Sequence, residues 1–86
     1  MKLKQNYALR EIAGELLLVP VGKASLNFNQ MLTLNEVGAD IWKLIPEADS
    51  EEEIVTRLLQ EYEVDPEVLR ADVAEFIESV RKLGIL

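Results

Sequence analysis

The sequence contains neither cysteine nor histidine, so it lacks two side chains that proteins often use to bind metals and catalyse reactions. Without cysteine there is no disulfide and no thiolate ligand. Histidine is the commonest metal ligand and the commonest general base at neutral pH, and serines such as Ser25 and Ser79 therefore have no histidine to activate them. We expect a protein that is not an enzyme and has no cofactor and no metal site.

Long hydrophobic runs are also missing. The longest apolar stretch without a charge extends from Leu16 to Gly22, whereas a membrane-spanning helix needs roughly 20 such residues. No signal-peptide pattern opens the sequence. We expect a cytoplasmic protein with no membrane partner.

Positive charge is scarce, because 9 Lys and Arg stand against 16 Asp and Glu and give a net charge of −7. Affinity for nucleic acids depends mainly on cations that neutralise phosphates. The composition therefore predicts no nucleic-acid partner and favours a basic partner surface. The acidic run Glu51–Glu53 is interpreted as a solvated helix face, since its side chains point to different sides of a helix.

The hydrophobic content of the chain is high enough to form a folded core. The chain has 86 residues, of which 49% are hydrophobic, which is enough for one core but not for two. We therefore expect residues 1–86 to form a single domain.

The N-terminal part of the sequence predicts three strands, at about residues 7–12, 16–21 and 30–34. A tight turn containing Gly14 joins the first two strands into a hairpin. Pro20 lacks an N–H group, so the second strand is expected to end at a sheet edge or a bulge. The segment 22–29 (GKASLNFN) has the composition of a loop, and either extends the third strand or lies over the core.

The first of three predicted helices follows the third strand directly, at about residues 35–45. Thr33 with Glu36 forms a capping-box pattern, and Asn35 is an alternative N-cap. Pro46 is expected to end this helix.

Two more helices are predicted at about residues 50–62 and 66–83. Ser50 with Glu53 is a second capping-box pattern, and Asp65 followed by Pro66 is typical of a helix start. On the third helix the apolar residues share one arc about 120° wide, which we expect to face the core: Leu69, Val73, Phe76, Ile77, Val80 and Leu83. The element order predicts an α+β fold.

Helices after a hairpin also suggest a winged-helix DNA-binding or transcription-regulator module. Its recognition surface would be the third helix, with Arg70, Arg81 and Lys82. Acidic residues on the same helix, such as Asp72 and Glu78, interrupt any continuous basic stripe. DNA binding is therefore the alternative hypothesis.

The short strand at 30–34 is expected to lie at a sheet edge, where unpaired N–H and C=O groups can accept a strand from another chain. The third helix would wall its open side. Arg70, Ala74, Ile77 and Arg81 lie at one margin of the apolar arc, and the small Ala74 would leave room for a guest side chain. The competing interpretation is that both arginines cover core surface with their methylene stems.

Three stretches, LNEVGADIW, EEIVTRLLQEYEVDPE and DVAEFIESVRKLGIL, resemble the PqqD-like family over roughly residues 7–86. The resemblance implies a winged-helix-like fold with a three-stranded antiparallel sheet packed on three helices. It also implies a RiPP recognition element, which binds the leader segment of a ribosomally synthesised precursor peptide and presents it to a modifying enzyme. That enzyme is often a radical S-adenosylmethionine (SAM) enzyme, and the family itself was first met in the biosynthesis of pyrroloquinoline quinone (PQQ).

In this family the leader adds as a further strand beside the third strand, in a groove walled by the third helix. Carried over to this sequence, the resemblance implies a peptide-binding site made of Gln30, Met31, Leu32, Thr33, Arg70, Val73, Ala74, Ile77 and Arg81. The connection GKASLNFNQ is longer than family members commonly have, so the register of the third strand stays open. The same edge could pair with a second copy, so a monomer and a dimer are both compatible with the sequence.

Overall fold

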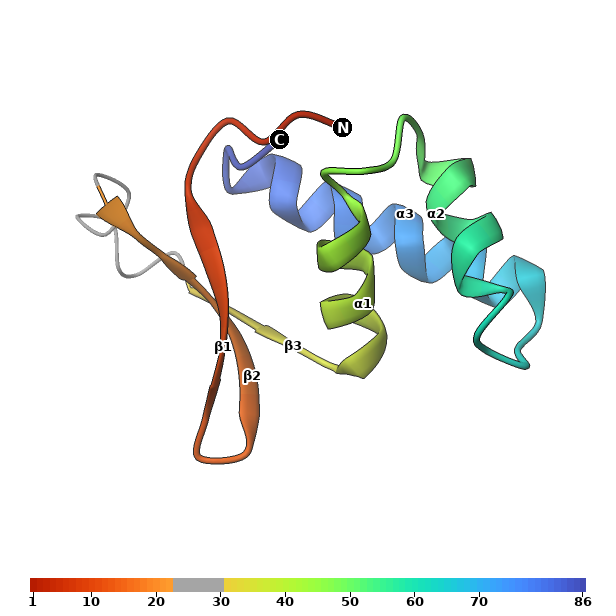
Figure 1. Ribbon diagram of the computed structural model, residues 1–86, viewed down its shortest axis with the longest axis horizontal. Helices are drawn as coiled ribbons and strands as arrows, with labels where there is room; N and C mark the ends of the chain where they lie inside the picture. Colours follow the sequence, from red (N-terminus) through yellow and green to blue (C-terminus); the bar gives the residue numbers. More distant parts are fainter. Residues whose placement is uncertain (23–30) are drawn as a thin grey trace.

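The computed structural model describes residues 1–22 and 31–86, and it places three strands before three helices (Figure 1). The elements are β1 (Tyr7–Ile12), β2 (Glu15–Pro20), β3 (Leu32–Leu34), α1 (Glu36–Leu44), α2 (Glu51–Leu58) and α3 (Pro66–Lys82). The predicted α+β class, with an antiparallel sheet followed by three helices, is confirmed.

The sheet has the order β1-β2-β3, and both neighbouring pairs are antiparallel. Ala13 and Gly14 form the two-residue turn between β1 and β2, with φ angles of 53° and 81°. Positive φ at both positions is typical of a type I′ turn, whose twist matches that of a hairpin. The hairpin prediction is confirmed, and β3 lies at an edge of the sheet.

Each helix begins at a side-chain cap. The Asn35 side chain accepts a hydrogen bond from the Gly38 N–H at 2.7 Å, and Ser50 and Asp65 cap α2 and α3 in the same manner. The starts predicted at Ser50 and Asp65 are confirmed. For α1 the alternative cap Asn35 is correct and the Thr33 capping box is wrong, because Thr33 still belongs to β3.

Two elements differ from their predicted bounds by two or more residues at one end. Helix α2 ends at Leu58 instead of residue 62, because the N–H groups of Gln60 and Glu61 bond to carbonyls three residues earlier, at 3.2 and 3.0 Å. Such bonds tighten the chain out of the α-helix. Strand β3 begins at Leu32 instead of residue 30. Residue 30 itself lies outside the described residues, and so does most of segment 22–29, for which the sequence left two alternatives open.

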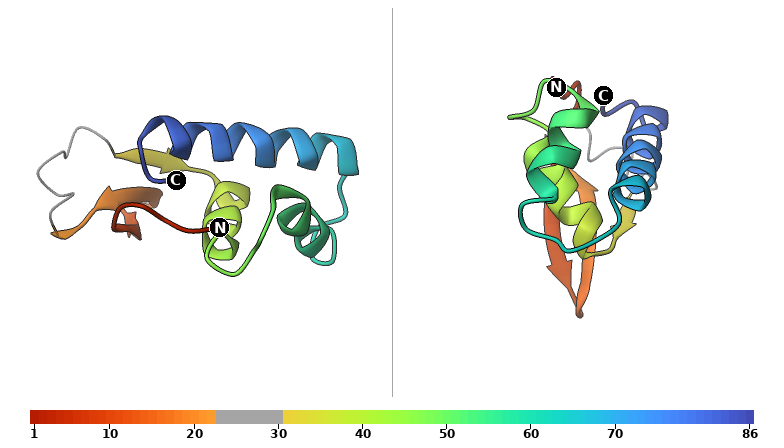
Figure 2. Two further views of the ribbon diagram at one scale, coloured as in Figure 1. Left: turned by 90° about the horizontal axis from the view of Figure 1, so that it is seen from above. Right: turned by 90° about the vertical axis from the view of Figure 1, so that its right-hand side faces the viewer.

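Helices α1 and α3 lie against the sheet, α2 packs on α1 and α3, and the core extends from the sheet into the space between the helices. Figure 2 shows α3 passing along the β3 side of the sheet, with α1 between the sheet and α2. Leu18 and Leu34 from the sheet belong to the same core cluster as the buried stripe of α3, which contains all members of the predicted apolar arc except the half-buried Leu83. Within the described residues, no helix combines the length and apolar character needed to span a membrane.

Candidate functional site

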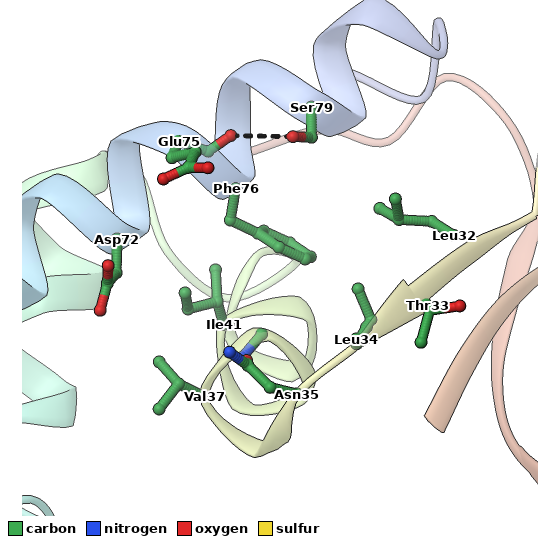
Figure 3. Close-up of a pocket in the computed structure, with 11 residues that line it drawn as sticks. Leu32, Thr33, Leu34, Asn35, Val37, Ile41, Asp72, Glu75, Phe76 and Ser79 are labelled. Carbon is green, nitrogen blue, oxygen red and sulfur yellow. Dashed lines mark hydrogen bonds between the residues drawn. The ribbon is translucent and has the colours of Figure 1, made fainter. Parts of the chain in front are cut away.

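A groove with a volume of about 240 Å³ lies between β3 and α3 (Figure 3). Small-molecule pockets usually have about 300 to 1,000 Å³, so this groove is better suited to a few side chains than to a cofactor. Residues from three elements line it. They are Leu32, Thr33, Leu34 and Asn35 at β3 and its end, Val37, Gly38 and Ile41 on α1, and Asp72, Glu75, Phe76 and Ser79 on α3.

One wall of the groove is the free edge of β3. Leu32 and Thr33 pair with Leu18 and Leu17 of β2 on one side, and no strand within the described ranges pairs with them on the other. In an antiparallel strand, alternate residues direct N–H and C=O groups to each side. The groove side of β3 therefore presents hydrogen-bonding groups of the backbone that another strand can satisfy.

The floor of the groove is the Phe76 ring, which packs over the first turn of α1. A Cβ atom on Gly38 would lie 3.5 Å from a carbon of this ring and 3.2 Å from the Asn35 side-chain oxygen. The absent side chain at Gly38 thus lets the ring and the helix cap occupy the same corner. Phe76 itself is 9% exposed, so the floor is continuous with the hydrophobic core.

The α3 rim of the groove is acidic. Asp72 and Glu75 are exposed, and neither forms an ion pair with any residue that the structure describes. Ser79 donates a hydrogen bond to the Glu75 backbone carbonyl at 3.1 Å. No lysine or arginine is among the lining residues given above.

The opposite margin of α3 faces α2 and is held by Arg70. The Arg70 guanidinium donates two hydrogen bonds to the Glu52 carboxylate, at 2.8 and 3.1 Å, and one to Glu67 at 2.5 Å. These hydrogen bonds raise the pKa of Arg70 above its usual range, and the hydrogen bond from Arg70 lowers the pKa of Glu52. Arg70 thus links α2 to the start of α3.

Of the nine residues that the resemblance implied as a site, the groove brings two together, Leu32 and Thr33. Met31 precedes β3 and is 53% exposed, and Gln30 lies outside the described residues. On α3, Val73 and Ile77 are fully buried in the core, whereas Ala74 and Arg81 are exposed. None of the α3 residues in that set lines the groove, which lies at the other margin of the apolar arc.

The residues on the α3 side of this groove were not predicted from the sequence. Asp72 and Phe76 contributed to the family resemblance but were given no binding role, and Glu75 and Ser79 were not selected as site residues. One signal was available. Phe76 is the largest residue of the apolar arc, and Asp72 and Ser79 stand four positions before it and three after it, on the same side of a helix.

The structure does not favour the DNA-binding alternative. Arg70 is engaged by two carboxylates, and the groove face of α3 presents Asp72 and Glu75. A phosphate backbone would meet negative charge there.

Across residues 1–22 and 31–86 there is no cluster of three or more acidic, histidine or cysteine side chains that could hold a metal ion.

Comparisons with known proteins agree with this geometry. The family model described as coenzyme PQQ synthesis protein D (PqqD) matches residues 14–86. A solved structure titled "TbiB1 in Complex with the TbiA(beta) Leader Peptide" is 27% identical, with a TM-score of 0.71 over 100% of this chain and 94% of that chain. No curated protein matches the sequence.

A second solved structure shares the fold at lower identity. It is titled "Lasso peptide synthetase B1 complexed with the leader peptide", is 19% identical, and has a TM-score of 0.72 over 98% of this chain and 93% of that chain. The two comparisons show that the arrangement of β3 and α3 belongs to a fold that other proteins share.

Proposed function

Since this chain belongs to the PqqD family, we propose that it is a noncatalytic adaptor that binds the leader segment of a ribosomally synthesised precursor peptide. It presents the rest of that peptide to a modifying enzyme, for which we propose a radical SAM enzyme. The observation that carries the proposal is the unpaired edge of β3 beside the α3 groove. A relative with 27% identity, solved with a leader peptide, supports it.

The leader binds by strand addition. It lies beside residues 31–34 and extends the sheet by one strand, so that the backbone groups on the free edge of β3 become paired. Its inward side chains enter the space between Leu32 and Phe76. We assign this contact to Leu32 and Thr33 of β3 and to Met31, which directly precedes the strand.

Backbone pairing alone contributes little net affinity. About four hydrogen bonds at roughly 0.5 to 1.5 kcal/mol each are nearly offset by an association cost of at least about 4 kcal/mol. Burying one leucine, isoleucine or phenylalanine of the guest contributes a further 1.5 to 3 kcal/mol, roughly. The side chains that the groove accepts therefore decide both affinity and the choice of leader.

The adaptor role explains why the chain needs no catalytic groups. Its composition, without cysteine or histidine, suits a protein that positions a substrate for another protein's chemistry. We propose that it acts in the cytoplasm, where ribosomal peptides are made.

The test uses synthetic peptides from the short reading frames that flank the gene. Each peptide, covering about the first 20 residues of a frame, carries a fluorescent label and is titrated with the protein while anisotropy is measured. We expect saturable binding of at least one peptide and none of its scrambled version. Equal binding of native and scrambled peptides would contradict the proposal, and so would modification of a bound precursor by the adaptor alone, detected by mass spectrometry.

A further inference from the structure

The groove between β3 and α3 is chemically divided along its length. Leu32 and Asp72 lie at opposite ends of it (Figure 3). Near Leu32 the surface is apolar, because the Phe76 ring extends toward this end. Toward Asp72 the α1 wall remains apolar, with Val37 and Ile41, but the rim of α3 carries two carboxylates, those of Asp72 and Glu75. A guest strand lying in the groove therefore passes from an apolar end to an end with an acidic rim.

The two carboxylates are unlike those on the other margin of α3. Glu52 and Glu67 both receive hydrogen bonds from Arg70, whereas Asp72 and Glu75 have no cationic partner in the part of the chain that the structure describes. They stand three positions apart on one helix, where like charges repel. A guest cation between them would relieve this repulsion.

The spacing of a β-strand fits this division. Asp72 and Phe76 are four positions apart on α3, which corresponds to a rise of about 6 Å. Side chains on one face of a strand are separated by two residues, or about 6.8 Å. An apolar guest side chain on Phe76 therefore places the side chain two residues away beside Asp72, and the long stem of lysine or arginine extends this reach by about two more residues.

We infer that the leader recognised by this chain carries a lysine or arginine about two to four residues from an aliphatic or aromatic anchor. The anchor packs on Leu32 and Phe76, and the cation lies between Asp72 and Glu75. This inference rests on the proposed function and adds the chemical class of its peptide. The net charge of −7 acts in the same direction, because it attracts basic segments and repels acidic ones.

The test begins with a display library of random peptides about ten residues long, selected on the folded protein and sequenced. The key variant is Asp72→Asn/Glu75→Gln. Its matched control, Glu63→Gln/Glu78→Gln, removes the same charge from exposed positions that do not line the groove. The wild type and the control are expected to enrich peptides that combine the anchor with a basic residue. The key variant is expected to keep the anchor and lose the basic residue.

Affinities of single peptides quantify this preference. For an enriched peptide we expect replacement of its lysine by glutamine to weaken binding to the wild type by about three- to tenfold at low salt. The difference should shrink at about 0.5 M salt and disappear in the key variant. Asp72→Glu retains the charge and should retain the preference. All these positions are exposed, and circular dichroism checks that each variant folds.

The outcomes separate the inference from the function on which it rests. Enrichment of the apolar anchor without a basic residue would overturn the inference and leave peptide binding intact. A basic preference that survives in Asp72→Asn/Glu75→Gln would also overturn it, because the cation would then bind elsewhere. If no peptide is enriched, both the inference and the proposed function fail.

Discussion

The Tyr62 hydroxyl donates a hydrogen bond to the Asp40 carboxylate, which joins the turn after α2 to α1. This hydrogen bond, with smaller contributions from burial and from the negative charge of Asp40, raises the pKa of Tyr62 to about 12 from its usual 10. The bond needs the protonated phenol. Its contribution to stability is therefore fully present below pH 10 and is lost as the pH rises towards about 12.

Replacing Tyr62 with phenylalanine should lower the free energy of unfolding by about 1 kcal/mol near neutral pH, the usual net value of such a bond. The loss should become smaller between pH 10 and 12, since the wild type then loses the bond as well. Urea denaturation followed by circular dichroism measures the free energy of unfolding of both proteins near neutral pH and between pH 10 and 12. Asp40→Asn is the control, because its amide oxygen can still accept the bond without the charge. An effect of Tyr62→Phe that is equally large at both ends of this pH range would contradict the assignment.

The two caps that the sequence suggested for α1 should differ in their effect on stability. Asn35→Ala removes the acceptor of the Gly38 N–H bond and should destabilise the protein by about 1 kcal/mol. Thr33→Val removes only the hydroxyl from an exposed strand position and should change stability by less than about 0.5 kcal/mol. Thermal unfolding measures the stability of both variants. A larger loss of stability in Thr33→Val than in Asn35→Ala would favour the Thr33 capping box.

A tryptophan placed on either margin of α3 tests which margin binds the peptide. Ser79→Trp should fill the groove and weaken peptide binding at least about tenfold, because it takes the place of a buried guest side chain. Ala74→Trp puts the same ring at an exposed position outside the groove, and should change affinity less than about twofold. Anisotropy titrations provide both values. The site that the resemblance implied around Ala74 stays a prediction, and the opposite result would favour it.

We expect Arg70 to contribute to the stability of the fold and not to the affinity for the peptide. In Arg70→Met the pKa of Glu52 should rise back towards its usual 4.5, because the hydrogen bond that lowers it is gone. A lowered carboxyl pKa stabilises the fold above its usual value and loses this effect as the pH falls, so the variant should lose less stability below pH 4.5 than the wild type does.

Carbon-detected NMR titration follows the Glu52 carboxyl group in both proteins, and denaturation at several pH values follows stability. Peptide affinity is the control measurement, and we expect it to be unchanged. A clear loss of affinity would place Arg70 in the binding site.

Local signals in the sequence predicted most of the fold. Ser50 and Asp65 begin helices where side-chain caps predict them, Gly14 occupies the predicted hairpin turn, and the apolar arc of α3 is buried. These features depend on residues close together in the chain, so local physical chemistry determines them.

The α3 side of the groove could not be predicted in this way. Periodicity locates the buried arc of a helix, but the arc has two margins and its period does not say which one meets β3. That choice depends on long-range packing, above all on the approach of Phe76 to Gly38. The end of α2 at Leu58 depends similarly on tertiary structure, since Tyr62 bonds to Asp40.

Amide hydrogen exchange in the presence of a bound leader peptide tests strand addition most directly. Measured by NMR, alternate amides within residues 31–34 should exchange more slowly when the peptide binds, while the outer edge of β1 serves as an internal control and should not change. Protection along β1 or over α2, with residues 31–34 unaffected, would contradict the account.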